Sequence, residues 1–131
     1  MIVSHKHKFI FLKTRKTAGT SIEIALSKHC GPEDIITPIH PPEDEQLRRE
    51  FGGLGPQNFA YPKSKYSLRD WAVLALKQKQ KSAYNHMPAS QVLHLVGPEV
   101  WNSYYKFTVA RNPWDAAISM YYWRSGESRP S

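Results

Sequence analysis

The chain has 131 residues, of which 40% are hydrophobic and 22% are charged. That length suits one compact domain, which would bury about two-thirds of the surface that the unfolded chain exposes. No apolar run approaches the ~20 residues that cross a bilayer, and the first residues lack the apolar stretch of a secretory signal. The one cysteine, Cys30, excludes an internal disulfide framework and a multi-cysteine metal site. We therefore expect a soluble, cytoplasmic protein without a membrane span.

Positive charge exceeds negative charge, because 18 Lys and Arg residues against 11 Asp and Glu residues give a net charge of +7. The excess lies in residues 1–31 and 52–131, whereas residues 32–51 are net acidic. A basic protein favours a polyanionic ligand such as a nucleic acid, a nucleotide, or a sulfated or phosphorylated sugar. Charge alone does not choose among these ligands, and a solvated basic surface is the plain alternative.

The first thirty residues are predicted to form a strand, a loop and a helix. The apolar, aromatic and β-branched run at residues 8–13 is typical of a buried strand. Residues 14–19 form a loop rich in small and cationic side chains, and a helix begins at Thr20 and ends before Gly31. The face of this helix that is predicted to turn inward consists of Ile22, Ala25, Leu26 and His29.

Residues 32–66 are punctuated by proline and glycine, which predicts an irregular insert with one short helix at 43–51. Ser67 is a candidate N-cap for a helix that extends to about residue 81. Its amphipathic pattern places lysines 77, 79 and 81 outward. The inward face is predicted to consist of Leu68, Trp71, Ala72, Ala75 and Leu76.

The rest of the chain returns to helix and strand signals. A short helix, a helical turn, a second buried strand and a last helix are predicted at residues 88–95, 99–102, 104–110 and 114–123. Asn112 is a suitable N-cap for the last helix, and Pro113 is a suitable first helical residue. The sequence thus predicts one α/β domain, residues 1–131, with a parallel sheet flanked by helices. Ligands of such sheets collect beyond the carboxyl ends of the strands, so both strand-terminal loops are expected to face one crevice.

The first of these loops has the chemistry of a phosphate cradle. Small residues let successive backbone N–H groups point inward, and the helix N-terminus adds partial positive charge. Lys16 supplies a mobile full charge, while Thr17, Thr20 and Ser21 supply hydroxyl donors. The loop is not a Walker A motif, because it has no Gly-Lys-Ser/Thr. An ordinary strand–helix turn with surface lysines is the alternative interpretation.

The second loop offers a different anion ligand. Arg111 ends the second predicted strand, and its planar guanidinium suits phosphate oxygens. Ser119 is the one interior hydroxyl of the apolar helix that follows, about two turns beyond Arg111. The alternative is structural, with Arg111 paired to an acid such as Asp115 and Ser119 bonded to a carbonyl of its own helix.

Two motifs resemble those of the sulfotransferases that use 3′-phosphoadenosine 5′-phosphosulfate (PAPS). One is Lys16-Thr-Ala-Gly-Thr-Ser21 after a buried strand, and the other is Arg111-Asn-Pro-Trp with Ser119 eight residues past the arginine. The likeness is closest to the carbohydrate-type branch that includes the heparan sulfate 2-O-sulfotransferases and to its bacterial relatives. It implies a P-loop-like sulfotransferase fold whose 5′-phosphosulfate loop consists of Lys16, Thr17, Ala18, Gly19, Thr20 and Ser21. It also implies that Arg111 and Ser119 bind the 3′-phosphate. Relatives commonly carry proline where this chain has Arg15, which adds a further charge to the cofactor site.

His86 is the candidate general base. His5 and His7 lie in a basic leader that is expected to be mobile, and His94 falls in an apolar helical pattern. His86 precedes a helix on a loop that can enter the crevice, and its surroundings resemble the family's His-x-Pro-Ala stretch, whose histidine is the base for the acceptor. A neutral imidazole can take a hydroxyl proton near pH 7.

The resemblance also implies a mechanism and a set of partners. His86 would deprotonate a hydroxyl of an acceptor, expected to be a carbohydrate, and Lys16 would stabilise the departing product, 3′-phosphoadenosine 5′-phosphate (PAP). No metal is implied, because lysine and backbone donors stabilise the charge. No nucleic-acid partner is expected, and the insert at 32–66 is the expected acceptor-facing element.

The resemblance covers the amino-terminal half of these relatives. The fold is therefore expected to be incomplete, truncated at the C-terminus, where residues 124–131 form a polar tail. An open sheet edge would then favour a homo-oligomer. Two other functions stay open: a P-loop-like phosphotransferase, and a non-enzymatic module that binds a nucleotide or a polyanion.

Overall fold

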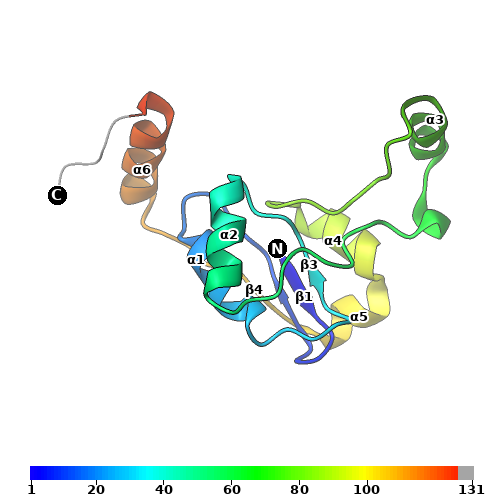
Figure 1. Cartoon of the computed structure of the whole chain (residues 1–131), viewed down its shortest axis with the longest axis horizontal. Helices are drawn as coiled ribbons and strands as arrows, with labels where there is room; N and C mark the ends of the chain where they lie inside the picture. The colour runs from blue at the N-terminus through cyan, green and yellow to red at the C-terminus, as the bar shows by residue number, and fades with distance from the viewer. Residues whose placement is uncertain (127–131) are drawn as a thin grey trace.

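The computed structural model describes residues 1–126, and its strands form one mixed sheet with helices on both faces (Figure 1). The strands are β1 Ile2–Ser4, β2 Phe9–Phe11, β3 Ile35–Ile36 and β4 Tyr105–Phe107. They lie in the order β3-β1-β2-β4, with β2 and β4 parallel and β1 antiparallel to both β2 and β3. The part of the predicted polar tail from residue 127 onward lies outside the described residues.

The helices lie where the sequence predicted helical segments, within a few residues at each end. They are α1 Gly19–Ser27, α2 Pro42–Glu50, α3 Leu68–Lys77, α4 Ala89–Val96, α5 Pro98–Ser103 and α6 Pro113–Ser125, with a 3₁₀ turn, η1, at Lys63–Lys65. Both predicted N-caps are confirmed. Ser67 forms a capping box with Asp70, and the Asn112 side chain accepts a hydrogen bond from the Trp114 backbone N–H at 3.0 Å.

The α/β class is confirmed, but the predicted parallel sheet is wrong. The residues expected to form a mobile leader begin with β1, which pairs with β2 so that Val3 lies opposite Ile10. Met1, Ile2 and Val3 are fully buried, because alternate residues of a strand face opposite sides of the sheet and both sides are covered here. Only the pair of β2 and β4 has the expected parallel arrangement.

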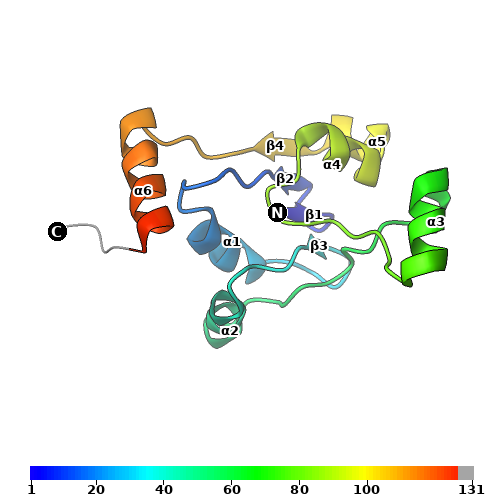
Figure 2. The same ribbon diagram turned by 90° about the horizontal axis from the view of Figure 1, so that it is seen from above.

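Each face of the sheet has its own hydrophobic core. On one face, Val3 and Ile10 pack with side chains that include Val92 of α4. On the other face, Ile2 and Phe11 pack with partly buried side chains of α1. Figure 2 shows α1 and α2 on one side of the sheet, with α4 and α5 on the other.

The buried face of α1 differs from the predicted one. Ile22 and Leu26 pack on the sheet as expected, but Ala25 and His29 are exposed. Glu23, between two isoleucines, is fully buried instead. The apolar spacing could not reveal that Glu23 forms ion pairs inside the protein, and these pairs turn its side of the helix inward.

The insert at residues 32–66 is more regular than predicted. It contains β3, which pairs with β1 through Ile36 and Ile35, and α2, which confirms the short helix predicted at 43–51. Thr37 and Arg48 are fully buried. Proline and glycine signals did not predict β3, because this strand forms through contacts with the N-terminal strand rather than from local propensity.

Two helices, α3 and α6, stand away from the sheet at opposite ends of the molecule (Figure 1 and Figure 2). None of the described residues of either helix is buried. Leu68 and Leu76, predicted to turn inward, are 90% and 84% exposed, so the predicted buried face of this helix is wrong. β4 is an edge strand and is less buried than predicted, with Tyr105 73% exposed. Within residues 1–126, no helix is long and apolar enough to cross a membrane.

Candidate functional site

A pocket of about 520 Å³ lies at the carboxyl end of β2 and collects most of the predicted site residues. Its walls are the loop between β2 and α1, the start of α2, the segment before α4, and one side of α6. The predicted residues that line it are Arg15, Lys16, Thr17, Ala18, Gly19, Thr20 and His86. As far as residues 1–126 define the pocket, Ser21, Arg111 and Ser119 do not line it.

The two strand-terminal loops lie side by side, as expected from the parallel pairing of β2 and β4. Thr14 Oγ1 donates a hydrogen bond to the Val109 carbonyl at 2.7 Å. Arg111 Nη1 donates to the Lys16 carbonyl oxygen at 3.3 Å. Lys16 and Arg111 therefore lie at the same edge of the sheet, next to one another.

Arg111 has protein partners of its own. Its Nε donates to Asp115 Oδ2 at 2.6 Å, which is the pairing that the structural interpretation expected. The two side chains are 30% and 38% exposed, and such a pair contributes about 1 kcal/mol or less to stability. Ser119 lies one helical turn beyond Asp115 on the same side of α6. The second loop therefore holds its guanidinium in place through a weak, partly solvated contact.

Three pocket residues have a left-handed backbone conformation. The φ angles are 59° at Lys16, 57° at Ala18 and 58° at His86. This conformation costs a non-glycine residue about 1 kcal/mol or more, and residues that adopt it gather at functional sites. Ala18 is also the N-cap of α1, and no side chain within residues 1–126 caps this helix. The first-turn N–H groups of α1 therefore suit an anion in the pocket.

One wall of the pocket is positively charged and partly aromatic. Lys16 Nζ lies 5.4 Å from the ring centroid of Trp123 in α6, a cation–π contact. Arg15 and Arg124 line the pocket with Lys16. With Lys13, four cationic residues from the loop and from α6 line one cavity, which favours a ligand with several negative charges.

The predicted hydroxyl donors have different surroundings. Thr17 Oγ1 lies 2.9 Å from Thr14 Oγ1 and donates to the Thr14 carbonyl at 3.2 Å, so Thr17 closes the loop on itself. Thr20 Oγ1 accepts a hydrogen bond from Lys13 Nζ at 3.0 Å and also lines the pocket. Of the two, Thr20 is better placed to donate to a ligand.

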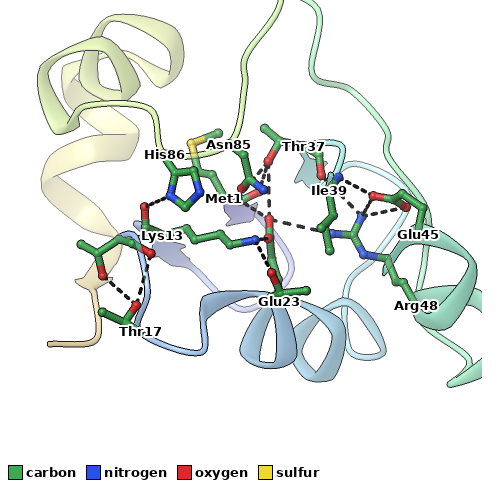
Figure 3. Close-up of polar contacts among 12 residues, drawn as sticks. Met1, Lys13, Thr17, Glu23, Thr37, Ile39, Glu45, Arg48, Asn85 and His86 are labelled. Carbon is green, nitrogen blue, oxygen red and sulfur yellow. Dashed lines mark hydrogen bonds and ion pairs between the residues drawn. The ribbon is translucent and has the colours of Figure 1, made fainter. Parts of the chain in front are cut away.

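A buried ion network beside the loop was not predicted. Glu23 accepts hydrogen bonds from the Met1 amino group and from Lys13 Nζ, the latter at 2.8 Å (Figure 3). Arg48 Nη2 lies 3.8 Å from Glu23 Oε1. The available signal was a lone acid in the apolar start of α1, ten residues after the lysine that follows β2.

His86 is held in the tautomer that a general base needs. Its Nδ1 lies 3.1 Å from the Lys13 carbonyl oxygen, which can only accept, so Nδ1 carries the proton and Nε2 keeps its lone pair. Burial lowers the pKa of His86, the hydrogen bond to Lys13 opposes that shift, and the positive charges of Lys13 and Arg15 add to it. The imidazole is therefore neutral near pH 7 and can accept a proton at Nε2.

The polar pocket residues that were not assigned from sequence include His40, Asp44 and Asn85, as well as Lys13, Thr14 and Arg124. Asn85 Oδ1 accepts a hydrogen bond from the Met1 amino group at 2.9 Å. Asp44 lies in the first turn of α2, and among residues 1–126 it forms no ion pair. Since His40 and Asp44 belong to the insert at 32–66, that segment contributes one wall of the pocket.

Within the described part of the chain, no group of three or more His, Cys, Asp or Glu side chains is placed to hold a metal ion. Comparisons of the chain with models of protein families, with curated proteins and with solved structures gave no match. The pocket's own chemistry is therefore what indicates a function. It combines a cationic loop at a helix N-terminus with a neutral imidazole in one cavity.

Proposed function

We propose that the chain binds PAPS in this pocket and transfers its sulfuryl group to a hydroxyl of an acceptor, with a carbohydrate as the expected class. One observation carries the proposal: His86 and the loop around Lys16, far apart in sequence, line the same cavity. A proton acceptor beside an anion-binding loop is what in-line transfer from a phosphate-linked donor to a hydroxyl requires.

The charges and donors of the two loops fit the anionic groups of this cofactor. Lys16, Arg15 and the first-turn N–H groups of α1 would hold the 5′-phosphosulfate, with the Thr20 hydroxyl as a further donor. Arg111 and Ser119 do not line the pocket as residues 1–126 define it, so they would hold the 3′-phosphate where the cofactor extends beyond it onto the adjoining loop and α6. When bound, PAPS supplies the sulfuryl group and leaves as PAP.

The chain's own residues would contribute mainly position and charge. His86 Nε2 would take the proton of the acceptor hydroxyl, because its Nδ1 is already committed to the Lys13 carbonyl. The Lys16 ammonium would stabilise the negative charge that develops on the departing phosphate. The left-handed residues Lys16 and Ala18 fix the shape of the loop before any ligand arrives, which limits reorganisation during the reaction.

Thermal unfolding with three ligands tests the proposal. PAP without metal should raise the melting temperature by about 5–15 °C at 100 times its Kd, since that occupancy adds about 2.7 kcal/mol of stability. Stronger protection by ATP with magnesium would indicate a phosphotransferase instead. Protection by DNA that falls steeply with salt would indicate a polyanion-binding module. Either result, in the absence of an effect of PAP, contradicts the proposed function.

A further inference from the structure

We propose that Lys13 is a positioning residue that orients the Thr20 hydroxyl toward the 5′-phosphate of the cofactor. The proposal rests on the proposed function, because that phosphate is taken to be the ligand of Thr20. Lys13 lies two residues beyond the end of β2, its side chain is only 4% exposed, and it is one of the residues that line the pocket. Because its ammonium is already bonded to Thr20 and Glu23, it acts through the residues that it contacts.

The contacts of the Lys13 ammonium fix the direction of the Thr20 hydroxyl. Nζ donates to Thr20 Oγ1 at 3.0 Å and to Glu23 Oε2 at 2.8 Å. An ammonium carries only hydrogens, so it occupies a lone pair of Oγ1 and leaves the hydroxyl hydrogen for another acceptor. Because Thr20 lines the pocket, that acceptor can be a phosphate oxygen of the ligand.

Gly19 leaves room for the Lys13 side chain to reach Thr20 and Glu23. A Cβ atom at Gly19 would lie 2.7 Å from Lys13 Cγ and 3.2 Å from Lys13 Cε, closer than side chains pack. The stem of Lys13 therefore runs directly against the backbone at the start of α1. Glycine is therefore needed at position 19 for the packing of the Lys13 side chain, independently of any ligand.

Lys13 also contacts the other half of the site. Its carbonyl oxygen accepts the hydrogen bond from His86 Nδ1 at 3.1 Å, while its side chain extends toward Glu23 (Figure 3). One residue thus holds the tautomer of the proposed base and the rotamer of a proposed phosphate ligand. This placement couples the two halves of the pocket through a single backbone position.

Charge balance alone does not account for this arrangement. Glu23 also accepts a hydrogen bond from the Met1 amino group and lies 3.8 Å from Arg48 Nη2. Arg48 therefore also compensates the charge of Glu23, while burial lowers the pKa of the Met1 amino group to about 6. A lysine that only neutralised Glu23 would need no bond to Thr20. The bond to Thr20 is the feature that a positioning role requires.

A double-mutant cycle on PAP affinity tests the proposal, with Lys13→Met, Thr20→Val and the double variant measured by isothermal titration calorimetry. Thr20→Val should weaken PAP binding about 10- to 100-fold, as for loss of a hydrogen bond to a charged group. Lys13→Met should weaken it less. If Lys13 acts through Thr20, the double variant should bind PAP within about twofold of Thr20→Val alone.

A matched cycle with Thr17→Val serves as the control. The Thr17 hydroxyl bonds to Thr14 and not to Lys13, so its effect should multiply with that of Lys13→Met. Should Lys13→Met fail to fold, Lys13→Met with Glu23→Gln removes both members of the buried pair. Thr20→Val is then combined with this double variant, and PAP affinity is compared in the same way.

The outcomes separate this proposal from the proposed function. If wild-type protein binds PAP and the effects of Lys13→Met and Thr20→Val multiply, Lys13 is merely structural and only the positioning role is overturned. If wild-type protein does not bind PAP, the proposed function fails and the positioning role fails with it. If Lys13→Met is coupled to Thr20→Val but not to Thr17→Val, the result supports both the positioning role and the proposed function.

Discussion

The two loops that form the site are held by different means. The loop after β2 rests on fully buried ionic contacts, with Lys13 and Glu23 within 2.8 Å of each other. The loop after β4 leads into α6, none of whose described residues is buried, and its pair of Arg111 and Asp115 is partly solvated. The proposed chemistry thus has one half that is fixed by the fold and one half that is only lightly held.

The largest expected effect comes from breaking the buried contacts. Glu23→Gln removes the acceptor charge shared by Lys13, the Met1 amino group and Arg48, and leaves buried cations without it. We expect the free energy of unfolding in urea to fall by about 3–5 kcal/mol. Asp115→Asn, on the lightly held loop, should cost about 1 kcal/mol or less. Equal losses at both positions would contradict the contrast between the loops.

The next effect separates turnover from binding. Lys16→Ala should reduce kcat by about 10²–10³-fold, as for loss of one group that stabilises developing negative charge, and should weaken PAP binding much less. Arg111→Ala should instead weaken PAP binding. Transfer of labelled sulfate and calorimetry measure the two quantities. Lys28→Ala, an exposed cation beside Phe51 and outside the pocket, is the matched control.

The pH dependence sharpens the role of His86. Burial lowers the pKa of this histidine from its ordinary value of 6.5, and a base works only when deprotonated. Activity should therefore be present above the lowered pKa and be lost as pH falls through it, with the midpoint of the acid limb of kcat/KM below pH 6.5. Arg15→Gln removes a positive charge near the imidazole and should move that limb to higher pH. A limb at or above 6.5 in the wild type would count against His86 as the base.

The smallest expected effect concerns the insert. Asp44 brings a carboxylate into the same pocket as the cationic loop, where it repels an anionic ligand. Asp44→Asn should tighten PAP binding about two- to fivefold at low salt, and the gain should shrink as salt increases. Glu43→Gln, one residue earlier, exposed and outside the pocket, should leave the Kd unchanged. Weaker binding by Asp44→Asn would show that the carboxylate orders the site.

Local sequence signals predicted the helices and strands that short stretches of sequence specify by themselves. The apolar run at β2, the capping residues Ser67 and Asn112, and the breaks at glycine and proline located the helices and the two parallel strands. β1 and β3 have only three and two residues, and they form through pairing between segments, β1 with β2 and β3 with β1. The exposed faces of α3 and α6 could not be predicted, since an apolar pattern does not say whether a partner surface is present.

Much of the candidate site could be predicted from residue type and position. The small and cationic loop after β2 and the histidine before α4 were found because each carries recognisable chemistry next to a recognisable element. Lys13, Glu23 and Asp44 were not assigned, because their roles depend on which segments meet in space. A buried lysine and a surface lysine give the same sequence signal.

The left-handed backbone at Ala18 restricts which residues position 18 can accept. With φ 57° and ψ 22°, the position admits glycine, asparagine or aspartate readily, while valine, isoleucine and threonine are excluded by their branched Cβ atoms. In a saturation library at this codon, sorted for retention of PAP, the survivors should be small or Asx residues. Enrichment of β-branched variants would mean that the loop rearranges when it takes up its ligand.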